Sequence, residues 1–542
     1  MAGIHSGEIA YAIFNGVLAS LVVGWLFLRL YRRAVEKTMR TSAAGKGTGL
    51  HAVPPPVAPR AVPPPSVGAR SSAAVRRNLA LAYGLAFVLS ALALSAPELR
   101  EFTRESSAAI ELALQTLVIV VTNASPAIVL IGFLVAAPAR RIFRAFVIVW
   151  IAGCVLTVGI PVIGRMMGGR SLDAGLAMNA YYFTIALALN ALPPLVLVFL
   201  TGRPRIRNVM PLVLAVVVLL SLALTIFDAW LKGNVDDAQR VNALLRWAVG
   251  NLGATFGPAL LFLMSSLPVG VLGWWAIGRV ASGYEAKKFS DMQLIVDAWW
   301  GVVVALHLVT LWRYGAAVSV TACIAAYVIY LFGSRLAVKA LRLSERTSGP
   351  SLLLLRVFGF QARTERLFDA VAARWRFEGT VAMIAGADLA LRSVDAGEAL
   401  AFVRGDIDSS YVGNDEKLAE RLRDLEHLPD PDGRFRIAQF FCYDDTWRAT
   451  LESLITRSSI VLMDLRGFTK ANAGCVFELQ QLSSAGRLVN CVFVTDDTSD
   501  RTLAAACLGL RESDAEPWVA VRKLDPKALN TLWVRLMSAA RR

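Results

Sequence analysis

The sequence predicts a helical membrane protein with a C-terminal α/β domain, and three observations support this fold class. Of the 542 residues, 56% are hydrophobic and only 18% are charged. Apolar runs of about 20 residues recur from Ala10 to Phe332, and each is long enough to cross a hydrocarbon core of about 30 Å. Beyond Leu341, charged residues come every few positions and short apolar runs alternate with amphipathic stretches, which is typical of a water-soluble α/β domain.

The apolar runs predict an all-α polytopic domain of about nine transmembrane helices. The sequence then divides into a first transmembrane helix (1–36), a Pro-rich basic cytosolic linker (37–77), a transmembrane bundle (78–341), a juxtamembrane linker (342–350) and a cytosolic α/β domain (351–542). The linker contains two Ala-Val-Pro-Pro-Pro segments, which favour an extended spacer. The expected spans are 9–30, 79–97, 112–137, 143–164, 177–200, 209–231, 248–277, 293–311 and 315–333.

The charge distribution predicts the orientation of the chain. Residues 351–542 contain 25 Lys/Arg against 27 Asp/Glu, and the rest of the chain contains 31 against 14, so the net positive charge belongs to the membrane half. Basic residues gather in every second loop, for example at Arg140–Arg144 and Arg203–Arg207. The positive-inside rule therefore predicts a multi-pass inner-membrane protein with its N-terminus outside and its C-terminal domain in the cytoplasm. The basic loops are expected to contact anionic headgroups of the lipid bilayer, and no nucleic-acid partner is expected.

Few ionisable residues in or next to the expected spans are candidates for a function, namely Glu111, Asp228, Asp297 and His307. Ionisable residues inside a bilayer are usually functional, but three of these lie near span ends, which argues against ion-coupled transport. The segment Asn190–Pro194 predicts a proline kink or, alternatively, a broken helix at a binding site. The six cysteines form no Cys-x-x-Cys pair and only four histidines occur, so no metal site is expected.

The C-terminal domain is expected to form a mostly parallel, doubly wound sheet with helices on both faces. Strands such as Ile460–Met463 are apolar throughout, as burial on both faces requires. Ligands of such folds bind beyond the carboxyl ends of the strands, and polar residues concentrate at these ends. The expected strands are 352–358, 380–384, 435–441, 460–465, 489–495 and 518–521.

Two segments of this domain resemble the core of Toll/interleukin-1 receptor (TIR) domains. Ser458–Asp464 is similar to their Ser-then-apolar strand, and Gly474-Cys475-Val476-Phe477-Glu478-Leu479 is similar to the Trp-Cys-x-x-Glu-Leu signature of the helix that follows. The resemblance covers residues 444–497 well and the rest in element order, and it implies flavodoxin-like layering. The sequence departs from the family at its opening strand, at Gly474 and in a long insertion between Ala387 and Arg436.

Several TIR domains cleave NAD with the glutamate of that signature. The resemblance therefore implies that Glu478 is catalytic and that NAD or a related nucleotide is a substrate or ligand, with no cofactor required. The ligand-binding residues expected at the same edge are Asp464, Arg466, Gly467, Cys475, Asp444 and Asp445. Structural alternatives exist for each: Glu478 complements a helix N-terminus, Arg466 pairs with Asp464 or Asp445, and Asp444-Asp445 cap the next helix.

Three functions are open at this point. The first is an integral membrane signalling or effector protein, of the kind used in bacterial defence, whose TIR-like domain binds a nucleotide-like ligand or self-associates into a homo-oligomer and couples to the bundle. The second is a membrane-anchored NAD glycohydrolase that uses Glu478. The third is a transporter or channel with a regulatory cytosolic domain. The first is favoured, because the catalytic resemblance depends on one short motif.

Overall fold

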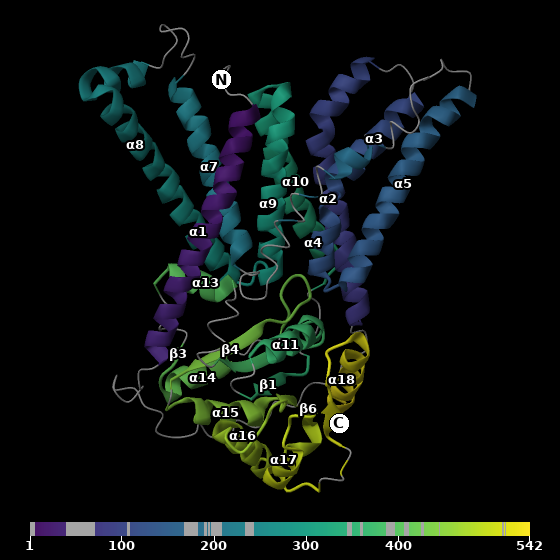
Figure 1. Cartoon of the computed structure of the whole chain (residues 1–542), viewed down its shortest axis with the longest axis vertical. Coiled ribbons are helices and arrows are strands. Elements are labelled where there is room, and N and C mark those ends of the chain that lie inside the picture. Colours follow the sequence, from purple (N-terminus) through teal and green to yellow (C-terminus); the bar gives the residue numbers. More distant parts are fainter. Residues whose placement is uncertain are drawn as a thin grey trace.

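The computed structural model shows a bundle of apolar helices above an α/β domain (Figure 1). The N-terminus lies at the end of the bundle that is remote from the α/β domain, and the C-terminus lies at the opposite end of the molecule. The residues that the structure describes are 6–39, 71–105, 109–166, 181, 183–188, 192, 196, 209–232, 243–343, 349–357, 361–385, 396–405, 411–423, 428–443, 445–511, 514 and 516–541.

The helical half contains long apolar helices. Among the described residues, six helices are long and apolar enough to cross a membrane, and a seventh span results if a bent pair, α3 and α4, is counted as one. The helices are α1 (Ser6–Met39), α2 (Ser72–Glu105), α3 (Ala109–Ala124), α4 (Ala127–Leu134), α5 (Ala139–Met166), α7 (Met210–Lys232), α8 (Ala243–Glu285), α9 (Asp291–Leu311) and α10 (Ala316–Ala340).

The predicted nine spans are therefore confirmed only as a set of membrane-length apolar helices. Eight of the nine expected ranges coincide with a helix or with the bent pair, although the apolar part of α7 is shorter than a full span. The ninth range, 177–200, lies mostly outside the described residues, as do Asn190 and the side chains of Glu111 and Asp228. The count of nine stays a prediction.

The observed helices depart from the expected ranges at three places. The third expected span is not one straight helix, because it bends by 49° between α3 and α4; Pro126 at this break has no N–H to donate. The linker is shorter than 37–77, because α1 continues to Met39 and α2 already begins at Ser72. The helix expected at 248–277 runs from Ala243 to Glu285 and contains a kink at Gly253, whose φ is 84°.

The core of the helical half lies between α2, α9 and α10. Phe87 of α2 contacts Trp300 of α9 and Tyr330 of α10, with ring centres 4.6 and 4.9 Å apart. Polar contacts also join these helices: the Trp300 indole donates to Ser90 Oγ at 2.9 Å. Asp297 forms an ion pair with Arg335 and accepts a hydrogen bond of 2.8 Å from Tyr330. These contacts join the three helices into one block.

The α/β domain contains a seven-stranded, entirely parallel sheet. Its strands are β1 (Leu352–Arg356), β2 (Val381–Ala385), β3 (Tyr411–Val412), β4 (Ile437–Cys442), β5 (Ile460–Asp464), β6 (Cys491–Thr495) and β7 (Trp518–Ala520), in the order β3-β4-β2-β1-β5-β6-β7. The helices between them are α11 (Gln361–Trp375), α13 (Ala396–Val403), α14 (Asp415–Arg423), α15 (Trp447–Arg457), α16 (Ala473–Ser484), α17 (Arg501–Leu508) and α18 (Pro526–Ala539). The six expected strands are all present, and only the two-residue strand β3 was not expected.

Helices cover both faces of this sheet, as predicted. Leu353 and Leu355 of β1 point into a core formed with α14, α15, α16 and α17, whereas Leu352 and Leu354 point into a second core formed with α11 and α18. Successive residues of a strand face opposite sides, so the central strands must be apolar at every position. The observed three-layer arrangement confirms the doubly wound α/β prediction.

The strand order is not that of a flavodoxin-like sheet. A flavodoxin-like sheet has the order 2-1-3-4-5, with one strand beyond β1 on that side. Here β2, β4 and β3 all lie on one side of β1, and the chain then returns to place β5 on the other side. Apart from the edge strand β3, this is the 3-2-1-4-5-6 order of dinucleotide-binding folds. The order reverses between β1 and β5, which is the topological switch point.

Candidate functional site

The carboxyl ends of β1 and β5 meet at the switch point, where ligands of this fold class bind. Arg356, the last residue of β1, lies in register with Asp464, the last residue of β5. The helix α16 follows β5 and carries Cys475 and Glu478, both buried, on one face. The structure therefore brings five of the seven sequence-predicted site residues (Asp464, Arg466, Gly467, Cys475 and Glu478) to one edge of the sheet.

Asp464 and Arg466 form a buried ion pair at this edge. The guanidinium donates to both carboxylate oxygens, at 2.8 and 2.7 Å, and to the carbonyl oxygen of Arg363 at 3.1 Å. Asp464 also accepts a hydrogen bond of 2.9 Å from the Thr364 hydroxyl. Gly467 follows with a φ of 75° and lets the chain turn toward α16. The structural alternative for Arg466, a pair with Asp464, is thus present, and both groups form a wall of the site.

Glu478 is the one carboxylate of this edge that has an oxygen without a partner. Its side chain is 3% exposed, and Oε2 accepts no hydrogen bond from any described residue. Burial raises the pKa of Glu478 to about 8, while the nearby charge of Arg356 opposes the shift. The carboxyl group is therefore mostly neutral at pH 7 and offers both a donor and an acceptor. A buried carboxyl with a perturbed pKa at a switch point is a recognised mark of a functional site.

Cys475 and Arg356 complete this corner. The Cys475 thiol donates to the Arg356 carbonyl oxygen at 3.4 Å. This hydrogen bond joins α16 to the end of β1. The sequence analysis did not select Arg356 as a site residue, although an arginine at the end of four consecutive leucines was a signal for it. Asp444 lies outside the described residues, and Asp445 is exposed after β4, which β2 separates from β1. Asp445 therefore does not reach the switch point.

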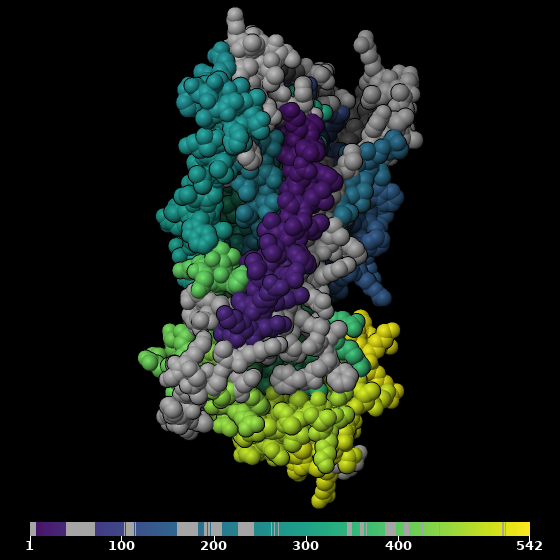
Figure 2. All heavy atoms as spheres, turned by 60° about the vertical axis from the view of Figure 1, so that its left-hand side comes forward, coloured from purple at the N-terminus to yellow at the C-terminus, as the bar shows by residue number. Residues whose placement is uncertain are grey.

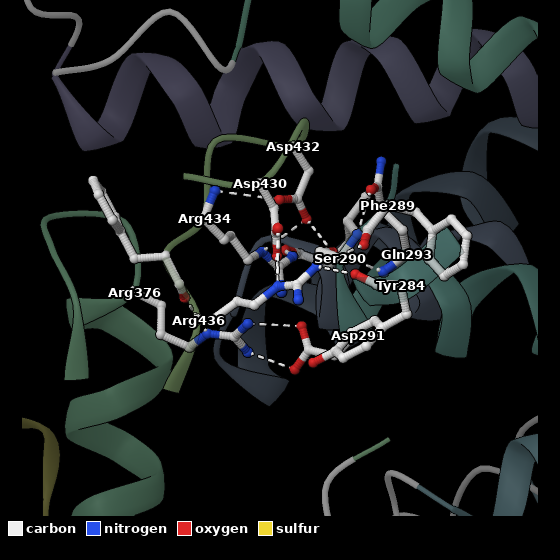
Figure 3. Close-up of polar contacts among 12 residues, drawn as sticks. Tyr284, Phe289, Ser290, Asp291, Gln293, Arg376, Asp430, Asp432, Arg434 and Arg436 are labelled. Carbon is white, nitrogen blue, oxygen red and sulfur yellow. Dashed lines mark hydrogen bonds and ion pairs between the residues drawn. The ribbon is translucent and has the colours of Figure 1, made fainter. Parts of the chain in front are cut away.

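A second buried polar site joins the α/β domain to the helices (Figure 3). It is built by residues 428–436, here called the docking loop, which precede β4 and belong to the insertion that departs from the TIR pattern. The loop lies against the turn between α8 and α9 and presents four alternating charged residues to it: Asp430, Asp432, Arg434 and Arg436. Three of these four contact the end of a different helix of the bundle.

Asp432 contacts the N-terminus of α9. Ser290 caps this helix in a capping box with Gln293, and the Ser290 hydroxyl donates to Asp432 at 2.6 Å. The partial positive charge of a helix N-terminus favours a carboxylate there. In the same turn, Asp291 accepts two hydrogen bonds, at 2.8 and 2.7 Å, from Arg376 of the α/β domain. Burial alone would lower the pKa of Arg376, but the Asp291 charge outweighs it and raises this pKa.

Arg436 and Arg434 contact helix C-termini, where the partial charge is negative. Arg436 donates at 2.7 Å to the carbonyl oxygen of Tyr284 in the last turn of α8 and lies 4.1 Å from the centre of its ring. Arg434 donates to the carbonyl oxygen of Leu134, the last residue of α4. Asp432, Arg434 and Arg436 thus each match the dipole of the helix end that they contact.

The docking loop also contains a carboxylate that pairs with one of its own arginines. Asp430 accepts hydrogen bonds from Arg436 at 3.0 and 3.1 Å. Burial and the charge of Asp432 raise the pKa of Asp430 to about 7, although Arg436 opposes the shift. At the tip of the loop, Gly433 has a φ of 79°, and a Cβ there would lie 2.7 Å from Val75 of α2 and 2.9 Å from the carbonyl oxygen of Leu343. Only glycine fits this position.

The rest of the insertion contacts the bundle as well. Phe402 of α13 packs edge-on against Phe27 and Tyr31 of α1, with ring centres 5.4 Å apart in both pairs. The Tyr31 hydroxyl donates to Glu398 at 3.1 Å. Figure 1 shows α13 at the base of α1, separated from the main body of the sheet. The insertion is therefore the part of the domain that is specialised for contact with the helices.

No group of three metal-ligating His, Cys, Asp or Glu side chains occurs in the part of the chain that the structure describes. Comparison by sequence finds no matching family model and no matching curated protein. The class of the protein therefore has to be argued from its fold and its two polar sites.

Proposed function

We propose that this chain is an integral membrane signalling protein of the inner membrane, in which a TIR-like domain binds a nucleotide-like ligand at the switch point and couples to the helical bundle through the docking loop. The observation that carries the proposal is the charge-matched contact of one loop with the ends of α4, α8 and α9. Six membrane-length helices support the membrane location. This contact buries several paired charges, such as Arg376 with Asp291, and loss of either partner would leave the other charge buried without compensation.

The two sites are connected through neighbouring strands of the sheet. Arg376, which holds Asp291, follows α11 and precedes β2, the strand next to β1. The docking loop leads directly into β4, which pairs with β2 over five residues. A ligand that shifts β1 or α16 at the switch point therefore displaces strands that begin at the bundle contact. Coupling between two sites requires a structural element whose conformational equilibrium is shifted by both of them.

Hydrogen exchange of the full chain in lipid nanodiscs tests this proposal, with NAD and ADP-ribose as the probes. We expect either probe to slow exchange in residues 464–478 and, at the same concentration, to change exchange in residues 284–293 and 428–436. A change confined to 464–478 would refute coupling. No change anywhere with either probe would refute a nucleotide-like ligand.

A second candidate function, hydrolysis of NAD, is favoured by the unpartnered Glu478 oxygen. A carboxylate beside the scissile ribose bond stabilises an oxocarbenium-like transition state, but a neutral carboxyl does not. Because the pKa of Glu478 is about 8, the rate of nicotinamide release should rise with pH toward that value. Release by the wild type that is lost in Glu478→Gln, with this pH profile, supports the enzyme. Equal release by Glu478→Gln excludes Glu478 as the catalytic group.

A further inference from the structure

One corner of the contact between the two halves is not charge-matched. Arg76, in the second turn of α2, and Arg374, in the last turn of α11, approach each other from opposite halves of the molecule. The Arg76 guanidinium lies 5.8 Å from the centre of the Phe377 ring, three residues after Arg374. The Arg374 guanidinium lies 4.7 Å from the centre of the Trp533 ring on α18.

The guanidiniums of Arg76 and Arg374 repel each other electrostatically. Partial burial and the charge of Arg76 lower the pKa of Arg374, and Glu378 opposes this shift. Among the residues that the structure describes, neither Arg76 nor Arg374 donates a hydrogen bond or forms an ion pair with a carboxylate. Both guanidiniums lie near aromatic rings, which accept no N–H···O hydrogen bond, so their N–H groups are available to an anion. Glu378 offsets the charge of Arg76 on Arg374 only in part, because the pKa of Arg374 still falls, so a further anion between the two cations is favourable.

Besides Arg76 and Arg374, a group of basic residues at the start of α5 lies near the boundary between the bundle and the α/β domain. Arg140, Arg141 and Arg144 are exposed in the first turn and a half of α5, and no acidic residue occupies that turn. At 100° per residue the three side chains fall within an arc of about 100°. They add to the partial positive charge of the helix N-terminus. Figures 1 and 2 both show this end of α5 directly above α18, which carries Trp533.

The surface above these arginines fits an acyl chain. Along α5, Phe143 is 70% exposed, and Ile148, Ile151 and Val155 are exposed in the following turns. A lipid whose headgroup lies at the start of α5 would place its hydrocarbon along this apolar stripe. Phosphate groups accept hydrogen bonds from two guanidiniums at once, and basic residues at the inner surface attract anionic lipids.

We propose that Arg76, Arg374 and the arginines at the start of α5 bind the phosphate of an anionic lipid, whose headgroup then bridges the bundle and the α/β domain. The lipid would supply a countercharge of the kind that Asp291 supplies for Arg376. The site is separate from the switch point and does not depend on the proposed nucleotide ligand.

Native mass spectrometry of the full chain, extracted from nanodiscs of phosphatidylcholine with or without phosphatidylglycerol, tests the proposal. Each basic residue at an anionic surface contributes about fivefold to binding, so Arg76→Gln with Arg374→Gln should weaken retention of phosphatidylglycerol about 30-fold. Arg535→Gln is the matched control, because Arg535 lies on α18 but pairs with Glu516 at 2.7 Å. Equal retention by the double variant, or an equal loss in Arg535→Gln, would overturn the proposal.

A second variant keeps the test decisive if the double variant folds poorly. Arg374→Glu places a carboxylate opposite Arg76 and so replaces the anion. In phosphatidylcholine alone, this variant should melt at a higher temperature than the wild type, and phosphatidylglycerol should no longer raise its melting temperature. A wild type that is stabilised equally by inorganic phosphate in phosphatidylcholine nanodiscs would show a soluble-anion site and refute the lipid. A melting temperature of Arg374→Glu that still depends on phosphatidylglycerol would also refute it.

Discussion

Replacing Glu478 with glutamine should remove a pH dependence of the stability of the α/β domain. The carboxyl group has a pKa of 4.5 in its ordinary state and about 8 in the folded domain. Because the folded-state pKa is raised, the folded domain binds the proton more tightly than the unfolded chain. Stability is therefore fully present below pH 4.5 and is lost as the pH rises through 8. At about 1.4 kcal/mol per unit, the loss amounts to about 5 kcal/mol, of which about 3.5 kcal/mol falls between pH 5 and 8.

Pulse proteolysis in urea measures this loss in the full chain, because peptides of the α/β domain can be quantified separately from those of the bundle. The wild-type midpoint should fall steadily from pH 5 to pH 8. The Glu478→Gln midpoint should change much less, so that the variant becomes the more stable form at pH 8. Glu452→Gln, a partly exposed glutamate of α15, is the matched control and should follow the wild type. Parallel curves for the wild type and Glu478→Gln would show that this carboxyl is ionised in the folded state.

The remaining predictions concern the buried contacts. Gly433→Ala should separate the docking loop from α2 and raise hydrogen exchange in residues 284–293, whereas Gly405→Ala, which has a φ of 77° and open space around it, should not. Asp432→Asn keeps the shape but removes the charge at the start of α9, so we expect it to destabilise the contact by about 1–3 kcal/mol, read as faster exchange at Gln293. Asp464→Asn leaves the buried Arg466 guanidinium without its countercharge, and a loss of about 3–5 kcal/mol should appear in the urea midpoint of the α/β domain. An unchanged midpoint for Asp464→Asn would mean that Arg466 finds another partner.

The sequence was sufficient to predict the elements that are determined by their own composition and length. A strand buried on both faces has to be apolar throughout, so Ile460–Met463 could be recognised from its composition. The same holds for helices such as α9, whose apolar length is set by a bilayer. Strand β3 was missed, because two residues carry no periodicity. The strand order was also beyond the sequence, since it depends on where the chain returns after the insertion.

The two sites differ in how far the sequence could define them. Glu478, Cys475 and the Asp464–Arg466 pair follow one strand and the next helix, so proximity along the chain predicts proximity in space. Arg356 comes from another strand, more than a hundred residues earlier, and only the register of β1 with β5 places it there. The charges of the docking loop were visible as an alternating pattern. Their partners are helix ends from distant parts of the chain, which no local pattern identifies.

The energetics of the docking loop favour an all-or-none contact. A fully paired buried ion network adds little net stability, because desolvation of the charges offsets their attraction. Removing one partner is far more costly, since it leaves a charge buried without compensation. Partial withdrawal of Asp432 would expose the N-terminus of α9 while Arg434 and Arg436 stayed buried. We therefore expect the loop to be either fully docked on the helix ends or fully released. A contact with these two states is what a signal between the α/β domain and the bundle requires.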